Sequence, residues 1–332
     1  MITKLCQIWR PESYHGTGKK NNFFEGWFFK LVDKSRQHIY AVIPGIFRGS
    51  KPEESHAFIQ ILDGKTHASS YHRYPLYQFK AARDRLRIQI ESNHFSDKEI
   101  SLSIESKKRI IQGTVYLGDL QPWPVKFFTP GVMGWYAFVP FMECFHGILS
   151  LDHPLSGQLQ TDTGMISFDG GRGYIEKDWG KSFPEAYIWM QCNHFNRTDS
   201  SLSVSIAKIP WLTGAFRGFI IGLWWDGRLY PFTTYNGARL NRVSVKEKQI
   251  QFEIESRNYL LKASANRINQ GQLHGPYQNL MLSRVSESLD SQLTLEFYEK
   301  EGDSWRNILS LSGEPAAVEA NGRLEEIVDD GR

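Results

Sequence analysis

The stretch FFEGWFFKLV, residues Phe23–Val32, begins a series of short apolar and aromatic runs that continues with Ile39–Phe47 and His56–Leu62. Polar and apolar residues alternate within these runs, and β-branched and aromatic residues are frequent. Both features favour β-strands of about five to ten residues. Asp63-Gly64, directly after the third run, fits a tight hairpin turn. The chain therefore begins with antiparallel strands.

The same texture continues to the C-terminal end, with Asp226-Gly227 and Asn236-Gly237 as further turn signals. Only Met133–Phe141 could form a turn or two of helix. We therefore predict an all-β protein, a meander of antiparallel strands in two barrels. The further expected strands are Leu86–Glu91, Ile100–Glu105, Ile110–Leu117, Tyr174–Asp178, Tyr187–Phe195, Leu202–Ile209, Gly218–Trp225, Arg239–Val245, Gln249–Ser256, Tyr259–Asn266, Leu293–Lys300 and Ala316–Glu319.

The length of 332 residues exceeds the usual size of one compact domain, which favours two. The region Phe127–Leu155 is rich in Gly, Pro and aromatic residues and separates the two series of strands. We place the domain boundary shortly after it. The expected domains are residues 1–160 and residues 161–332, packed together.

Charge and cysteine content exclude several classes of protein. The 39 Lys and Arg against 36 Asp and Glu leave a net charge of +3, too small to indicate a nucleic-acid partner. The three cysteines, Cys6, Cys144 and Cys192, lack metal-ligand spacing and are typical of reduced thiols in a cytoplasmic protein. We expect no metal site.

The segment Met1–Pro11 has no apolar stretch long enough for a signal peptide, and no run of 18 apolar residues occurs. We expect a cytoplasmic protein that does not span a membrane. A lipid ligand would require peripheral membrane contact through an exposed aromatic rim or loop. The sequence does not identify that surface, nor the oligomeric state.

The densest cluster of reactive side chains lies in Asp169–Pro184, DGGRGYIEKDWGKSFP. In a strand, the period of two places Tyr174, Glu176 and Asp178 on one face. Burial among rings and repulsion between carboxylates both raise a carboxyl pKa, so one of these acids could remain a proton donor near neutral pH. The alternative is a structural corner, with the carboxylates capping turns or paired with Arg172 or Lys181.

Three further segments supply candidates for binding or catalysis. In YIWMQCNHF, Tyr187, Gln191 and Asn193 alternate with Met190, Cys192 and His194. Amides can orient a quinol hydroxyl, or they can satisfy buried backbone groups. Near the N-terminus a single acid stands among rings, and a lone histidine follows an aromatic-rich loop. The candidates for substrate binding are Glu25, Trp27, Trp179, Trp189, Gln191, Asn193 and His194, and His146 joins the catalytic candidates.

Three stretches together resemble the tocopherol cyclase family, in order and spacing along nearly the whole chain. They are Trp9–Lys30, His146–Leu159 and Phe168–Phe195. The resemblance implies two lipocalin-like barrels and an enzyme that closes a phytyl hydroquinone to a chromanol without a cofactor. A weaker similarity to carotenoid hydratases involves their Tyr-x-Asp motif, which Tyr174-Ile175-Glu176 matches with Glu in place of Asp.

This resemblance leads to a cofactor-independent isomerase of the tocopherol cyclase type. It would protonate a prenylated hydroquinone or related isoprenoid, with Glu176 as the acid beside Tyr174, and with Asp178 and His146 in support. The rival hypothesis is a non-catalytic carrier of a hydrophobic isoprenoid or lipid, whose carboxylates are ion-paired. A polyene held for a pericyclic reaction is a third reading.

Overall fold

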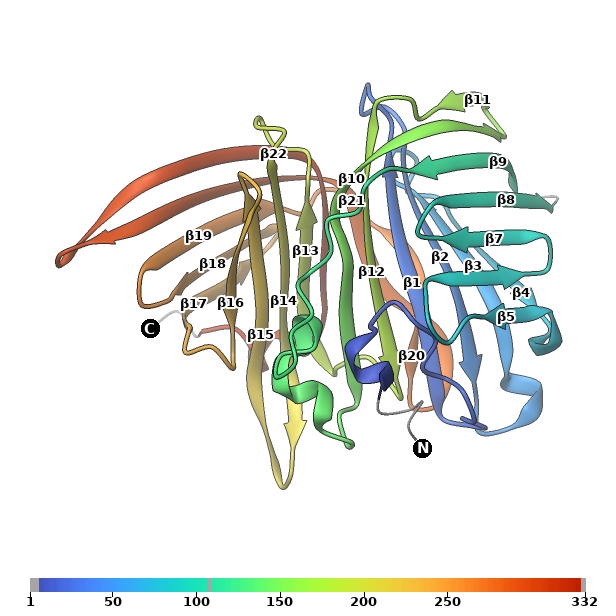
Figure 1. Cartoon of the computed structure of the whole chain (residues 1–332), viewed down its shortest axis with the longest axis horizontal. Coiled ribbons are helices and arrows are strands. Elements are labelled where there is room, and N and C mark those ends of the chain that lie inside the picture. Colours follow the sequence, from blue (N-terminus) through green and yellow to red (C-terminus); the bar gives the residue numbers. More distant parts are fainter. Residues whose placement is uncertain (1–5, 107–108, 330–332) are drawn as a thin grey trace. The chain divides into compact units, whose positions relative to one another are not determined.

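The computed structural model describes residues 6–106 and 109–329, and nearly all of them lie in antiparallel strands or the connections between strands (Figure 1). The strands form a 12-stranded and a 10-stranded sheet. The helical segments described are single 3₁₀ turns or short 3₁₀ runs: η1 (Gln7–Trp9), η2 (Pro52–Glu54), η3 (Leu76–Gln78), η4 (Gly131–Phe138) and η5 (Leu324–Glu326). The prediction of an all-β fold with one short helical stretch near Met133 is confirmed.

The first sheet has the order β4-β3-β2-β1-β12-β10-β9-β8-β7-β6-β5, with β11 paired to β10. The order follows the chain backwards from β4 to β1 and from β10 to β5, and β12 lies between β1 and β10, so β1 meets a distant part of the chain at the centre (Figure 1). The strands are β1 (Phe23–Val32), β2 (Ile39–Arg48), β3 (His56–Asp63), β4 (Ser69–Tyr74), β5 (Phe79–Ala81), β6 (Arg87–Ile90), β7 (Asn93–Ser96), β8 (Glu99–Ser106), β9 (Arg109–Leu117), β10 (Cys144–Thr161), β11 (Gly164–Ser167) and β12 (Gly171–Gly180).

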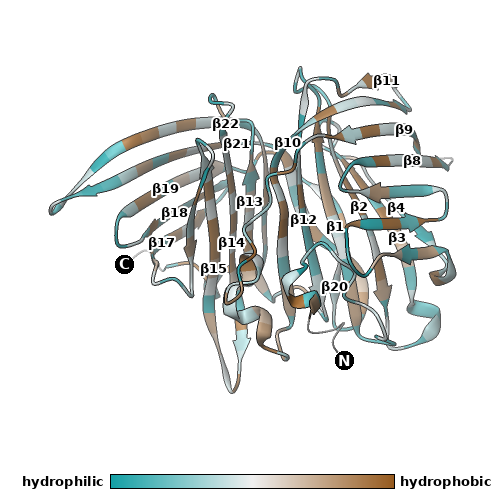
Figure 2. Cartoon of the chain, in the orientation of Figure 1, coloured by the Kyte–Doolittle hydropathy of each residue, from teal (hydrophilic) through white to brown (hydrophobic). Residues whose placement is uncertain are grey.

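Alternation along the strands builds the core on one face of this sheet. On β1, Trp27, Phe29 and Leu31 point into the main core cluster, together with Ile59 of β3 and Ile175 of β12. Figure 2 shows apolar and polar residues alternating along strands of both sheets. Because side chains in a strand point to opposite faces in turn, the core residues follow a period of two.

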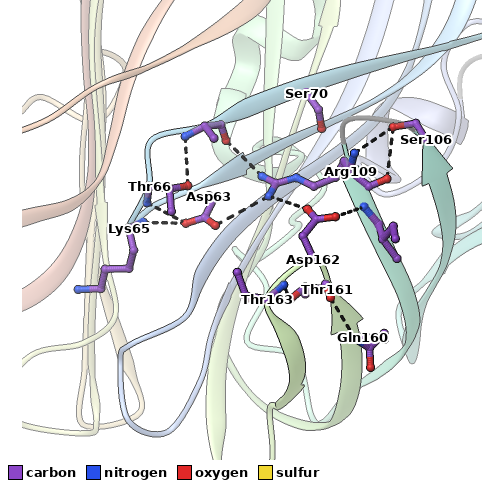
Figure 3. Close-up of polar contacts among 12 residues, drawn as sticks. Asp63, Lys65, Thr66, Ser70, Ser106, Arg109, Gln160, Thr161, Asp162 and Thr163 are labelled. Carbon is purple, nitrogen blue, oxygen red and sulfur yellow. Dashed lines mark hydrogen bonds and ion pairs between the residues drawn. The ribbon is translucent and has the colours of Figure 1, made fainter.

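The first sheet is strongly curved. Arg109 at the start of β9 reaches Asp63 at the end of β3 and Asp162 after β10, at 4.0 and 3.5 Å, and donates to the carbonyl of Ala68 at 3.3 Å (Figure 3). The order of paired strands nevertheless begins at β4 and ends at β5, and within the described residues these two edges are not paired with each other. A closed barrel therefore stays a prediction.

The second sheet has the order β16-β15-β14-β13-β22-β21-β19-β18-β17, with β20 paired to β21. Its core combines Ile188 and Met190 of β13 with Val204, Phe252 and Phe297 from other strands. The strands are β13 (Ala186–Cys192), β14 (Ser200–Trp211), β15 (Gly214–Trp225), β16 (Arg228–Thr233), β17 (Arg239–Lys246), β18 (Gln249–Glu255), β19 (Tyr259–Asn266), β20 (Gly271–Tyr277), β21 (Leu280–Glu301) and β22 (Ser304–Gly322).

The turn signals had different outcomes. Asp226-Gly227 forms a two-residue turn between β15 and β16, with φ of 50° and 71°, as a type I′ hairpin requires. Asp63-Gly64 does not form a tight two-residue turn. The connection there runs from residue 64 to residue 68, and the Asp63 carboxylate accepts the backbone N–H groups of Lys65 and Thr66. The aspartate therefore caps a longer loop.

The contacts within the chain divide it into two compact units. The first comprises residues 1–183 and 272–284, and the second comprises residues 184–271 and 285–332. The predicted boundary near residue 160 lies inside β10, within the first of these units. The sequence of Phe127–Leu155 did not predict a strand. The reason is that Pro154 and two register irregularities, after Ile148 and after Ser150, interrupt the alternation of side chains along β10.

No helix in the described ranges, 6–106 and 109–329, is long and apolar enough to cross a membrane. The three cysteines carry free thiols, as predicted.

Candidate active site

The predicted face of β12 exists as the period of two requires. Tyr174, Glu176 and Asp178 project to one side of the strand, whereas Ile175 and Lys177 project to the other. Tyr174 is fully buried and Glu176 is 5 % exposed. Two carboxylates and a phenol thus share one face at the centre of the first sheet.

The neighbouring strand β10 adds His146 to this face. Its Cα is paired in register with that of Asp178, and Ile148 is paired with Glu176. Residues directly opposite on adjacent strands point to the same face of a sheet. The structure therefore brings together all four predicted catalytic residues, although one of them, His146, comes from a strand that the sequence did not predict.

The four side chains form a connected polar chain. The hydroxyl of Tyr174 donates to Oε2 of Glu176 at 2.6 Å, and Nδ1 of His146 lies 2.9 Å from Oδ1 of Asp178. Nε2 of His146 lies 3.8 Å from Oε2 of Glu176. The imidazole ring is thus placed between the two carboxylates, and Glu176 Oε2 faces both the phenol and the imidazole.

The charge of His146 follows from this placement. Burial alone would lower its pKa, but the charges of Asp178 and Glu176 and the hydrogen bond to Asp178 outweigh burial and raise the pKa to about 9. The ring is therefore an imidazolium at neutral pH. Its Nε2 is buried and has no hydrogen-bond partner, so this N–H points at Glu176 without being satisfied by it.

Cys144 lies two residues before His146 on β10. Burial, followed by the charges of Asp178, Glu143 and Glu176, raises the pKa of its thiol. A thiol in this state is a poor nucleophile. The site offers acid and base groups rather than a reactive cysteine.

His146, Glu176 and Asp178 each offer one ligand atom, and these atoms lie within 4.8 Å of one another. A nitrogen and two carboxylates could hold a divalent cation. A cation would have to displace the imidazole proton, which the raised pKa of His146 retains up to about pH 9. The expectation of a metal-free site stays a prediction.

Glu25 does not belong to this cluster. It lies on the opposite face of the sheet, where Oε1 is 2.7 Å from Nζ of Lys177 and where its carboxylate accepts the backbone N–H of His15. Both ionic side chains are fully buried. Burial alone would raise the pKa of Glu25, but Lys177 and His15 lower it. Glu25 is thus an ionised structural partner and not a candidate acid.

Two of the three tryptophans predicted to bind substrate, Trp27 and Trp179, lie on this Lys177 face. Lys177 Nζ is 5.0 Å from the ring centroid of Trp27 and 4.6 Å from that of Trp179, both within the range of cation–π attraction. Trp179 also stacks on His15 with centroids 4.3 Å apart. Lys177 and His15 were not predicted as partners of these rings from the sequence. Alternation along one strand does not show which residue of a distant segment lies opposite.

The remaining binding candidates lie in the second unit. Trp189 and Gln191 are buried on one face of β13, and Met190 points into the core on the other, as predicted. The expected strand to Phe195 ends earlier, at Cys192. Beyond it, Asn193 Oδ1 lies 2.9 Å from Nδ1 of His194, so the alternation predicted for these two residues does not continue.

A second pair of tyrosine and glutamate was missed. Tyr187 donates to Oε2 of Glu319 at 2.7 Å, and Asn321 donates to the Tyr187 hydroxyl at 3.2 Å. Glu287, fully buried, is paired in register with Glu319. The signal was present in the alternation AAVEANG, which places Val318 in the core and Glu319 and Asn321 on the other face of β22.

Residues 120–322 match the family model described as tocopherol cyclase-like. A probable chloroplastic tocopherol cyclase of Oryza sativa subsp. japonica is 23 % identical over 93 % of this chain and 77 % of its own length. The chloroplastic tocopherol cyclase of Zea mays is 22 % identical over the same shares.

Among solved structures, CghA determined with Sch210972 superimposes with a TM-score of 0.56 over 90 % of this chain and 88 % of its own, at 10 % identity. CghA alone gives a TM-score of 0.54, with 93 % and 90 % covered at 11 % identity. At such identities the likeness concerns the fold alone, and it extends over both sheets of the chain.

Proposed function

Because this chain belongs to the tocopherol cyclase-like family, we propose that it is an enzyme that closes an oxygen ring on a prenylated hydroquinone or a related isoprenoid. The observation that carries the proposal is the chain Tyr174–Glu176–His146–Asp178 on one face of the first sheet. Ring closure of this kind needs one well-placed acid and a site that excludes water.

Glu176 is the proposed acid. Its Oε2 accepts from Tyr174 and faces the imidazolium of His146, and the acidic proton is the one that this carboxyl carries in its neutral form. Loss of this proton leaves a carboxylate, and both neighbours stabilise that negative charge. Because they are already in place before the reaction, they favour the transition state in which the charge develops.

The reaction balances without a redox partner. The proton of Glu176 adds to the trisubstituted alkene and leaves a tertiary carbocation, and the phenol oxygen of the same molecule attacks this carbon and forms the C–O bond. The phenol proton then returns to Glu176. Substrate and product have the same atoms, so the reaction is an isomerisation that requires no cofactor.

Asp178 acts in this proposal as a positioning residue. Its contact with Nδ1 of His146 holds the ring so that Nε2 points toward Glu176. The buried indole of Trp189 and the buried amide of Gln191 remain our candidates for ligand binding in the second unit, with Asn193 and His194 beyond the end of the strand.

The carrier hypothesis is favoured by a specific observation. It predicts ion-paired carboxylates, and both Asp178 with His146 and Glu25 with Lys177 are paired in this way. A carrier would hold a hydrophobic isoprenoid and release it unchanged. Turnover separates the two hypotheses.

In the decisive experiment, the protein and its Glu176→Gln variant are incubated with a prenylated hydroquinone, and formation of the chromanol is measured. Chromatography is needed, because the chromanol has the same mass as the substrate. We expect product from the wild type and a loss of at least about a hundredfold in the variant, the usual contribution of a general acid.

Glu296→Gln is the matched control. Glu296 also accepts from a tyrosine two residues away, Tyr298, at 2.7 Å, but this pair is exposed on the second sheet. Its substitution should leave turnover unchanged. Equal turnover in wild type and Glu176→Gln would place the acid elsewhere, and tight binding without product would favour the carrier.

A further inference from the structure

A tight turn at residues 126–129 holds two exposed phenylalanines. Lys126 and Thr129 exchange two backbone hydrogen bonds, N to O at 3.0 and 3.2 Å, so the residues between them are the two central positions of the turn. Phe127 is 70 % exposed and Phe128 is 78 % exposed. Their rings are perpendicular, with centroids 4.9 Å apart. Exposed rings at both central positions of a turn are not explained by packing within the protein.

Trp9 of η1 contacts the turn and supports it. Nε1 of Trp9 donates to the carbonyl oxygen of Phe127 at 2.8 Å, and the indole stacks on the ring of Phe127 at 5.7 Å and meets that of Phe138 edge-on at 5.5 Å. Val125 and Phe138 are each 43 % exposed. The rings are therefore held in place at the surface before any partner arrives, which lowers the entropy cost of binding.

The charged side chain within this loop is basic. Residues 120–142 contain no Asp or Glu, and their one charged side chain is Lys126, which is exposed at the base of the turn. Arg10, beside the bracing Trp9, is exposed as well. Phe and Trp side chains flanked by cations fit the interface of a bilayer that contains anionic lipid.

We propose that the turn Lys126–Thr129, with Val125 and Phe138, is the surface through which this protein docks on a lipid bilayer. The backbone argues against strand addition by a protein partner, since the turn residues bond to each other and Pro122, Pro124 and Pro130 remove donors. The inference rests on the proposed function in one respect: a prenylated substrate resides in the bilayer, so the enzyme must meet it there.

The test measures by flotation how much of the protein binds to vesicles. One set of vesicles is neutral phosphatidylcholine, and the other is phosphatidylcholine mixed with anionic phosphatidylglycerol. The double variant Phe127→Ser/Phe128→Ser is compared with the wild type. Tyr77→Ser is the matched control, because Tyr77 is 79 % exposed elsewhere in the same unit. We expect the wild type to bind, more strongly to anionic vesicles, and the double variant to lose at least about tenfold in partition, with the control unchanged.

Several results would overturn the proposal: no binding by the wild type, equal binding by the double variant, or a dimer that the double variant dissociates without any vesicle binding. The last would make the turn a contact between copies of this chain. Turnover of a short-chain, water-soluble substrate separates docking from catalysis. The double variant should retain this activity, and Glu176→Gln should lose it while still binding vesicles.

Discussion

The proposed charge of His146 can be tested through the dependence of stability on pH. The folded pKa of about 9 lies above the ordinary value of 6.5, so His146 stabilises the fold fully below pH 6.5. This contribution is lost as the pH rises from 6.5 to 9, because in that range the unfolded chain releases the proton that the folded protein keeps. A difference of about 2.5 units corresponds to about 3 kcal/mol.

Urea unfolding of the wild type and of His146→Gln between pH 6 and 9.5 measures this loss. The free energy of unfolding of the wild type should fall by about 3 kcal/mol more than that of the variant over this range. Histidine ring resonances give the pKa directly, and Asp178→Asn should lower the pKa of His146 because it removes the nearest negative charge. A pKa for His146 at or below 6.5, or no change in Asp178→Asn, would refute the reasoning.

Two further predictions concern Glu25 and metal ions. Glu25→Gln should destabilise the fold by about 3–5 kcal/mol in urea unfolding, because it leaves Lys177 charged and buried without its partner. The control Glu185→Gln removes ion pairs at the surface, with Lys208 and Arg323, and should have little effect. Equal effects of the two substitutions would contradict this account. Chelators should not reduce turnover, and loss of activity on chelation would show that a metal is required. Added Zn²⁺ should inhibit more strongly at pH 9 than at pH 7, because the imidazole of His146 must lose its proton to bind the metal.

Local pattern was sufficient for several features of the site. Alternation placed Tyr174, Glu176 and Asp178 on one face, because successive side chains of any strand point in opposite directions whatever the rest of the fold. The type I′ turn at Asp226-Gly227 followed from residues that tolerate positive φ. The local pattern therefore predicts the candidate acid without its partners.

Pairing between distant strands was not accessible in this way. His146 meets Asp178 because β10 lies beside β12, although 32 residues separate them, and β10 itself was hidden by Pro154 and its bulges. The same holds for Glu25, whose partner Lys177 comes from the strand next to β1 in the sheet but far away in the chain. Register decides such contacts, and register depends on the whole sheet.

The sequence by itself determined the all-β class, the faces of individual strands and the resemblance to the tocopherol cyclase family, since these depend on local alternation and on motifs. Only the tertiary structure decided that Glu176 and Asp178 lie beside an imidazolium while Glu25 is buried against a lysine, and where the two units divide. The physical reason is that the charge state of a buried carboxyl depends on its neighbours in space, and those neighbours come from distant strands brought together by sheet pairing.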